Sequence, residues 1–311
     1  MDSWGSRLIG AAAAELAGAV ERLFEQQRTS WPLLARGLAG LRQSRTRTLR
    51  IGPHSIAVRH IPHRLKSTTA PVDVASIGAR PCFLCLQDLP PEQRGVAIGE
   101  EWVALCNPFP ILERHLTIVH REHVPQRLSG RIGALLVLAQ ALPTSFLIYN
   151  GPECGASAPD HLHFQACDRS LFPIDADTRD REGPVVEHPS RPIVLRDDSQ
   201  ERLAARLERL LLTLAERTPR PGEPLVNLAV FQADGRFTVY VFVRRRHRPG
   251  AFQRGELLLS PAAVDLCGVL VAPRAEDYER LTGELVAGIL DEVLVDRSEL
   301  RALAERSGAR T

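Results

Sequence analysis

The segment His161-Leu-His163-Phe-Gln165 carries two imidazoles and an amide at alternate positions. On a β-strand, residues two apart lie on the same face, so these three side chains would point the same way. A neutral imidazole is a good nucleophile toward phosphorus, and its second ring nitrogen can donate to a backbone carbonyl. A neighbouring amide can donate to phosphate oxygens on which charge accumulates. The pattern indicates transfer of a phosphorus group, although it also fits a polar strand face without a site.

A second group begins with Cys82-Phe-Leu-Cys85. Two thiolates this close can bind one tetrahedral zinc ion, which then needs two more ligands. The candidate histidines downstream are His115, His120, His123 and His161. A redox pair or an incidental spacing are the alternatives, although the βαβ pattern of a thioredoxin-like site does not surround these cysteines.

Two basic runs could bind phosphate. The first contains Arg59, His60, His63, Arg64 and Lys66, and Lys66 is the only lysine of the sequence. The second is the run Arg244-Arg-Arg-His-Arg248. A charge run at a strand end is more often a solvated edge, and the spacing of the second run indicates no specific mechanism.

The elements that must position these residues can be read from hydrophobic periodicity. Residues 1–45 are expected to be helical, with Ser30 capping a second helix and Pro32 in its first turn. Two strands are expected at 46–51 and 55–61, followed by a loop at 62–81. Further predictions are strands at 102–107, 115–120, 146–150 and 161–167, and a helix at 129–142. The small residues of 151–160 then place His161 and His163 where a loop enters a strand.

The remaining chain is predicted to be irregular at 169–190 and helical at 199–218. Strands at 225–232 and 236–245 would form a hairpin around Asp234-Gly235, and 273–307 would be mostly helical. This mixture predicts an α+β fold, with an antiparallel sheet flanked by helices.

Bulk composition bounds the function. The 311 residues have a net charge of +2, 44% hydrophobic and 24% charged residues, which is an ordinary globular composition without the basic excess of a nucleic-acid-binding face. No apolar run reaches the roughly 18 residues of a membrane span. Glu15 and Glu21 break the N-terminal apolar stretch, which favours an amphipathic helix over a targeting segment. Six cysteines indicate a reducing compartment, by default the cytoplasm.

Taken in order, the motifs resemble the galactose-1-phosphate uridylyltransferase branch of the histidine-triad superfamily. They are Cys82-Phe-Leu-Cys85, Asn107-Pro-Phe-Pro, HLTIVHREHVPQ (115–126), Gly155-Ala-Ser157 and His161-Leu-His163-Phe-Gln165. Residues 62–66 resemble that family's phosphate-contacting stretch. The sequences of segments 155–165 and 260–281 resemble the GDP-hexose phosphorylases more closely. The whole chain is most similar to an uncharacterised bacterial group of the superfamily. The resemblance covers about residues 45–300.

The resemblance implies an N-terminal helical segment (1–45), a catalytic half (46–190) and a related C-terminal half (191–311). It makes His163 the nucleophile and Gln165 its phosphate-stabilising partner. The residues that it places along the nucleotide and its phosphates are Arg64, Lys66, Asn107, Asn150, Gly155 and Ser157.

The same resemblance implies a structural zinc ion held by Cys82, Cys85, His123 and His161, with 38 residues from 85 to 123 and again from 123 to 161. Asp160 is an extra residue before the first histidine of the motif, compared with the relatives.

The implied reaction transfers a nucleoside monophosphate from a nucleotide-sugar or dinucleoside polyphosphate to phosphate or a sugar phosphate, through a covalent intermediate on His163. A phosphorylase is expected first and a hexose-1-phosphate nucleotidyltransferase second. A hydrolase is disfavoured because Gln165 cannot titrate. The rivals are a zinc-stabilised nucleotide-binding protein without catalysis and a redox protein. The relatives are often dimers, so a homodimer is one possible state, and the sequence leaves the oligomeric state open.

Overall fold

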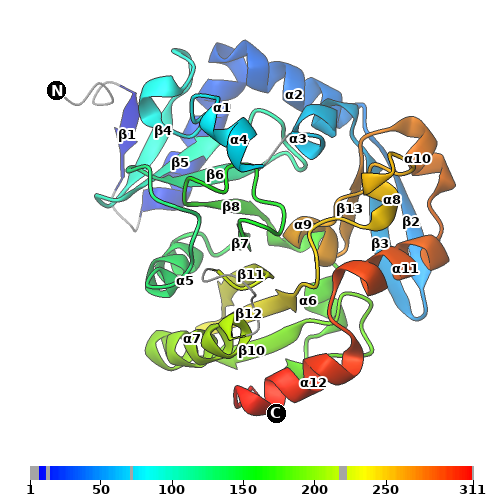
Figure 1. Ribbon diagram of the computed structural model, residues 1–311. Coiled ribbons are helices and arrows are strands. Elements are labelled where there is room, and N and C mark those ends of the chain that lie inside the picture. The colour runs from blue at the N-terminus through cyan, green and yellow to red at the C-terminus, as the bar shows by residue number, and fades with distance from the viewer. Residues whose placement is uncertain (1–6, 12–14, 71–72, 217–222, 310–311) are drawn as a thin grey trace.

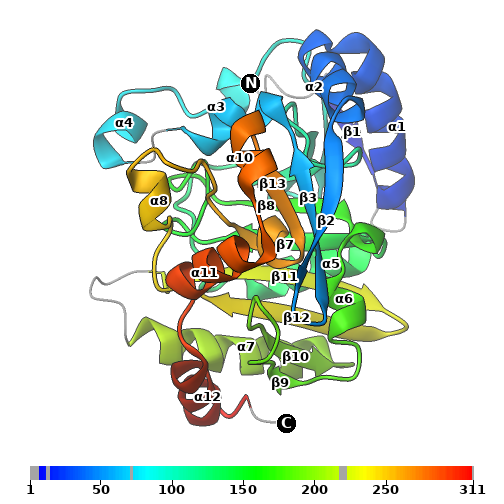
Figure 2. The same ribbon diagram turned by 90° about the vertical axis from the view of Figure 1, so that its right-hand side faces the viewer.

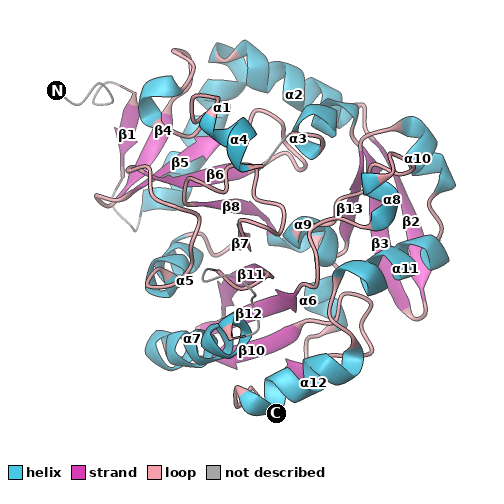
Figure 3. Cartoon of the chain, viewed as in Figure 1, coloured by secondary structure: helices cyan, strands magenta, loops and turns pink. Residues whose placement is uncertain are grey.

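The computed structural model describes residues 7–11, 15–70, 73–216 and 223–309. A sheet of ten strands forms its centre, and helices and a second, smaller sheet cover the two faces (Figures 1 and 3). The predicted α+β class is therefore confirmed. Among the described residues, no helix combines the length and apolar character that crossing a membrane requires.

Every neighbouring pair in the large sheet is antiparallel except β1 and β4, which are parallel. The strands follow one another across the sheet as β1 (Leu8–Gly10), β4 (Gly95–Ile98), β5 (Trp102–Cys106), β6 (Leu116–His120), β8 (His163–Asp168), β7 (Ser145–Asn150), β11 (Val226–Ala233), β12 (Arg236–Val243), β10 (Ile193–Asp197) and β9 (Gly183–Pro184).

The smaller sheet has the order β13 (Val269–Ala272), β3 (His54–His60) and β2 (Arg45–Ile51). β2 and β3 form an antiparallel hairpin, whereas β13 lies parallel to β3 although some 200 residues separate them in the sequence. Seen from the side, this sheet stands against the large one with α10 (Ala275–Arg280) and α11 (Gly283–Val293) beside it (Figure 2).

Helices pack on the opposite face of the large sheet. They are α1 (Leu16–Ser30), α2 (Pro32–Arg42), α5 (Ile132–Ala141), α7 (Gln200–Ala215) and α12 (Arg297–Arg306). α7 begins where the side chain of Ser199 accepts a hydrogen bond from the N–H of Arg202. Its leucines at 203, 207, 210, 211 and 214 are buried, which gives the apolar stripe of an amphipathic helix.

Short helical turns complete the connections. They are η2 (Pro62–Arg64), α3 (Leu65–Thr68), α4 (Val74–Gly78), η3 (Leu86–Asp88), η4 (Arg169–Leu171), α6 (Ile174–Asp177), α8 (Gly250–Gln253) and α9 (Ala263–Leu266). The segment 62–81, predicted as a loop, thus contains three of these turns, and the irregular segment 169–190 contains two.

Most strand and helix predictions are confirmed, including the hairpin of β11 and β12, whose turn residues Asp234 and Gly235 both have positive φ. Three predictions need correction. Residues 8–10 are a strand and not part of a helix, because they pair with the edge strand β4. Trp31, in extended conformation, caps α2, while Ser30 ends α1. β8 begins at His163, so His161 lies before the strand.

The hydrogen-bonded pair β7 and β11 joins the two predicted halves, with Asn150 opposite Asn227. The boundary between residues 190 and 191, the homodimer and the cytoplasmic location stay predictions.

Candidate active site and metal centre

His163 and Gln165 lie on one face of β8, paired with Val119 and Thr117 of β6. Both line a cavity of about 400 Å³. The expectation that His161 shares this face is wrong. The backbone before β8 is held by the loop after β6, because Leu162 N–H donates to the carbonyl of Val124. The ring of His161 consequently belongs to a different cluster.

The imidazole of His163 is fixed in one tautomer. Its Nδ1 lies 2.8 Å from the backbone oxygen of His161, an atom that can only accept, so Nδ1 carries the proton and Nε2 keeps its lone pair. His163 is 5% exposed, and desolvation lowers its pKa to about 4. The neutral ring with an unprotonated Nε2 is the form that can attack an electrophile.

Gln126 fixes the backbone on either side of this ring, a role that the sequence did not reveal. Its Oε1 accepts from the N–H of His163 at 2.8 Å, while its Nε2 donates to the carbonyls of His163 and Asn150. Gln126 is buried and connects the starts of two functional segments, β8 and the loop after β7. It ends the motif 115–126, which is the signal that could have identified it.

A hydrogen bond with the ring of His115 orients the amide of Gln165. The sequence suggested His115 as a possible zinc ligand. His115 is fully buried beside Gln165 and lies outside the cluster of metal-binding side chains. His120 lies outside it too, with its ring against Trp102 and its Nδ1 accepting from Glu122 N–H.

The predicted phosphate-binding residues divide between two adjoining cavities. Arg64, Lys66, Asn107 and Ser157 line the cavity of His163, while Asn150 and Gly155 line a smaller one that also contains Arg64 and Ser157. The other residues of the early basic run, Arg59, His60 and His63, line neither cavity, and each contacts a backbone carbonyl.

Both asparagines use their amide oxygens within the protein. Asn107 Oδ1 accepts from Phe109 N–H, and Asn150 Oδ1 accepts from Asn227 Nδ2 and Ala263 N–H. Gly155 has φ of +103°, and a Cβ there would lie 3.0 Å from the Cβ of Ala262. A glycine is therefore required for the loop 151–160 to approach the C-terminal part of the chain.

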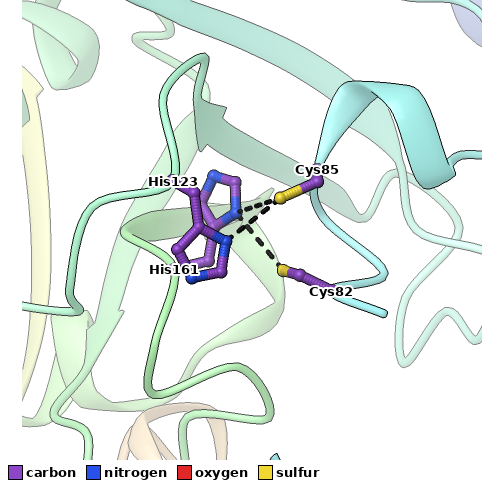
Figure 4. Close-up of side chains that lie close together, drawn as sticks. All are labelled: Cys82, Cys85, His123 and His161. Carbon is purple, nitrogen blue, oxygen red and sulfur yellow. Dashed lines mark hydrogen bonds between the residues drawn. The ribbon is translucent and has the colours of Figure 1, made fainter. Parts of the chain in front are cut away.

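Cys82, Cys85, His123 and His161 converge on one point (Figure 4). One ligand atom from each lies within 4.8 Å of all the others. The distance from Cys85 Sγ to His123 Nδ1 is 3.1 Å, and that from Cys82 Sγ to His161 Nδ1 is 3.4 Å. Burial, and next the adjacent Cys82, raise the pKa of Cys85 to about 12. The six cysteines of the chain are free thiols.

The hydrogen bonds around this cluster fit a bound metal. His161 Nε2 lies 2.8 Å from the backbone oxygen of His120, so Nε2 carries the proton and Nδ1 presents its lone pair toward the sulfurs. His123 Nε2 lies 3.4 Å from Asp160 Oδ2, which is the carboxylate arrangement often found behind a metal-binding histidine. Two thiols and two imidazoles are a donor set typical of tetrahedral zinc. The extra residue Asp160 thus lies next to one of the four candidate ligands.

A second group, His54, Asp177 and His188, also has its polar atoms close together. Its hydrogen bonds argue against a metal. His188 Nδ1 accepts from Ser190 N–H, so the proton lies on Nε2, which donates toward Asp177 Oδ2 at 3.4 Å. A nitrogen that carries its proton cannot also bind a metal, and this group is a hydrogen-bonded trio.

Residues 23–168 match a protein family described as Domain of unknown function (DUF4922). The galactose-1-phosphate uridylyltransferase of Caldanaerobacter subterraneus subsp. tengcongensis is 26% identical over 123 residues, which are 34% of this chain and 22% of that enzyme. The alignment thus spans about a fifth of the length of that relative.

Among solved structures, yeast Ap4A phosphorylase Apa2 superposes with a TM-score of 0.60 at 18% identity, covering 90% of this chain and 97% of that one. Its complex with Ap4A gives a TM-score of 0.61 at 18% identity, with 91% and 98% covered. At this identity the likeness shows the fold alone. The resemblance drawn from the motifs is confirmed by the sequence match to a uridylyltransferase and by the fold shared with Ap4A phosphorylase.

Proposed function

We propose that this protein transfers a nucleoside monophosphate through a covalent intermediate on Nε2 of His163. The observation that carries the proposal is the hydrogen bond from His163 Nδ1 to the carbonyl of His161, which leaves the second nitrogen unprotonated on a ring lining a large cavity. The similarity to a uridylyltransferase and to Ap4A phosphorylase supports an enzyme of the nucleotidyltransferase or phosphorylase type.

The shape and polarity of the 400 Å³ cavity suit a nucleotide. One part of its lining is apolar and includes Leu33, Phe83, Leu89 and Phe109. The polar part carries His163, Gln165, Ser157, Arg64 and Lys66. A base and ribose would pack in the apolar part, and the α-phosphate would then lie against the nucleophile and the cationic side chains.

The reaction has two steps. In the first, the lone pair of His163 Nε2 attacks the α-phosphorus, a P–N bond forms, and the bond to the leaving phosphate oxygen breaks with its electron pair on that oxygen. In the second, an oxygen of a phosphate-bearing acceptor attacks the same phosphorus and the electron pair returns to Nε2. The amide of Gln165 donates to the non-bridging oxygens in both steps. A phosphate leaving group needs no proton from residue 165, which favours transfer over hydrolysis.

A zinc ion held by Cys82, Cys85, His123 and His161 would be structural, because four protein ligands leave no open coordination position. It would fix the backbone two residues before the nucleophile. In this proposal all the chemistry at phosphorus belongs to His163, Gln165 and the cationic side chains.

Two substrate classes are ranked. A phosphorylase acting on a dinucleoside polyphosphate or a nucleotide-sugar comes first, supported by the fold shared with Ap4A phosphorylase over 90% of the chain. A hexose-1-phosphate nucleotidyltransferase comes second, supported by the sequence match to a uridylyltransferase. A zinc-stabilised nucleotide-binding protein without catalysis is the rival outside the enzyme class.

The test is covalent labelling. The protein is incubated with a panel of α-³²P-labelled dinucleoside polyphosphates and nucleoside diphosphate sugars, without phosphate, and analysed after denaturation. Wild type and a control variant His60→Ala, altered outside both cavities, should retain label with one donor, whereas His163→Ala should not. Equal labelling of His163→Ala would disprove the mechanism. Nucleotide binding without labelling or phosphate exchange would favour the non-catalytic rival.

A further inference from the structure

The second basic run, 244–248, divides into three parts with different surroundings. Arg244 is 3% exposed and donates to Asn227 Oδ1 and to the carbonyl of Pro261, so it is structural. Arg245 and Arg246 lie at the surface in ion pairs with Asp296, the N-cap of α12, and with Glu292 of α11. His247 and Arg248 instead line the smaller of the two cavities. The function proposed so far uses neither of these two.

This smaller cavity is assembled from segments far apart in the sequence. Its lining comes from residues 64–68, from the loop 150–157 and from residues 247–265. It shares Arg64, Ser67, Ser157 and Gln165 with the nucleotide cavity, so the two spaces adjoin at the amide next to the nucleophile. Its volume is about 80 Å³, against about 400 Å³ for its neighbour.

The cavity is rich in donors for an anion. Arg64 and Arg248 each donate to one backbone carbonyl, those of Phe109 and Thr68, and a guanidinium has five N–H groups. The Nε atoms of both arginines are buried and have no hydrogen-bond partner among the described residues. Although burial lowers the pKa of Arg64, its value of about 10 keeps the side chain charged at neutral pH.

One acidic residue, Asp265, also lines this space, and its carboxylate is turned onto the backbone. Oδ2 accepts from Ala262 N–H at 2.8 Å, and Oδ1 accepts from Val271 N–H at 2.9 Å. Its two oxygens therefore have donors of their own, so the two arginines dominate the charge that a ligand would meet. Ser157 and Ser260 add hydroxyl groups.

We propose that this cavity binds the phosphate of the acceptor in the second step, that Arg248 is a residue specific to that phosphate, and that the acceptor is inorganic phosphate. The proposal rests on the proposed function. The volume of this cavity is about one fifth of that of the nucleotide cavity, and two guanidinium groups line it, which suits a small oxyanion such as phosphate.

With phosphate as the acceptor, the second step accounts for every bond and for the proton. An unprotonated oxygen of hydrogen phosphate attacks the α-phosphorus of the nucleotidyl-His163, a P–O bond forms and the P–N bond breaks. The electron pair returns to Nε2, and the proton of hydrogen phosphate stays on the terminal phosphate of the product, a nucleoside diphosphate. By reversibility, the phosphate of the departing group in the first step occupies the same cavity.

The test measures phosphate binding without requiring the reaction. Sodium phosphate is titrated calorimetrically, at constant ionic strength, into the full chain carrying His163→Ala, alone or with Arg248→Ala or Arg246→Ala. We expect saturable binding, roughly tenfold or more weaker with Arg248→Ala and unchanged with Arg246→Ala, because only the first removes a guanidinium from the cavity. Arg248→Lys should recover part of the affinity through its charge.

A second arm adds phosphate or a hexose 1-phosphate to the isolated nucleotidyl form of the wild-type protein. Release of the nucleotide by the hexose 1-phosphate but not by phosphate would overturn inorganic phosphate as the acceptor. No phosphate binding, or equal binding with and without Arg248, would overturn the site. The titrated variants lack the nucleophile, so phosphate binding is measured independently of covalent labelling. Phosphate binding without labelling of the wild-type protein counts against the proposed function alone. Labelling of the wild-type protein without phosphate binding counts against this site alone.

Discussion

A hydrogen bond of 2.7 Å joins His115 Nε2 to Gln165 Oε1. The direction of this bond follows from the other side of the ring, where His115 Nδ1 accepts from the N–H of Ile111 at 3.2 Å. Nδ1 is therefore unprotonated, Nε2 carries the proton, and Gln165 must present its oxygen to His115. The NH₂ group of Gln165 is then the end left to face a phosphate.

The first prediction separates the two hydrogen bonds of His115. In His115→Asn, Oδ1 replaces Nδ1 and keeps the contact with Ile111, but nothing reaches Gln165. We expect kcat to fall about tenfold with KM nearly unchanged, which is less than the roughly 100-fold that follows loss of a transition-state donor itself. Steady-state kinetics with the labelled donor is the measurement. In the complementary His115→Gln, the donor returns, so a rate as low as that of the Asn variant would contradict the orienting role.

The second prediction concerns acid stability. Burial first, and Arg64 next, lower the pKa of His115 from 6.5 to about 3. Between about pH 3 and pH 6.5, His115 is therefore protonated in the unfolded chain and neutral in the folded chain. The free energy of unfolding should therefore fall as the pH is lowered from about 6.5. Urea unfolding between pH 4.5 and 8 should show a smaller loss in His115→Asn than in wild type. Parallel curves for the two proteins would exclude this contribution.

The third prediction concerns the metal. Purified protein should contain about one zinc ion per chain, and Cys82→Ser should contain close to none. With free zinc at 100 times Kd, the bound ion stabilises the fold by roughly 2.7 kcal/mol, which removal by a chelator should abolish. Elemental analysis and thermal unfolding measure both effects. Cys267→Ala, altered at a buried thiol elsewhere in the core, is the matched control and should keep its zinc.

The fourth prediction concerns Asp160 and His123. Asp160→Asn removes the charge behind the imidazole, and loss of such a contact typically costs about 10- to 100-fold in metal affinity. Competition with a chromophoric chelator gives the affinity directly. Glu153→Gln, an exposed carboxylate of the same loop, should leave it unchanged. An Asp160→Asn variant with wild-type affinity would show that the contact does not support the metal.

Periodicity predicted the elements whose signal is local. The apolar stripe of α7 after Ser199 and the turn at Asp234-Gly235 both depend on neighbouring residues alone, and the structure contains them. β1, β4, β9, β10 and β13 were not predicted, because each has at most five residues and is defined by its partners in the sheets. Pairing of this kind produces no hydrophobic periodicity within the segment itself.

The site shows the same division. His163 and Gln165 share a face because side chains of a strand alternate, which the sequence predicts. The histidines near the cysteine pair could not be sorted by spacing, since their ring orientation depends on contacts such as those of His120 with Trp102. His161 leaves the strand because the backbone of Leu162 pairs with the loop after β6.

The pairing of β7 with β11 has a consequence for how the chain unfolds and whether its fragments aggregate. Leu147, Ile148 and Tyr149 of β7 are each at most 1% exposed, and their backbone pairs with β11 on one side. A polypeptide cut between the two predicted halves would expose this apolar strand edge to water, and exposed edges of this kind promote aggregation. We therefore expect the ten strands to melt in a single cooperative transition, with no protease-resistant fragment that retains half of the sheet.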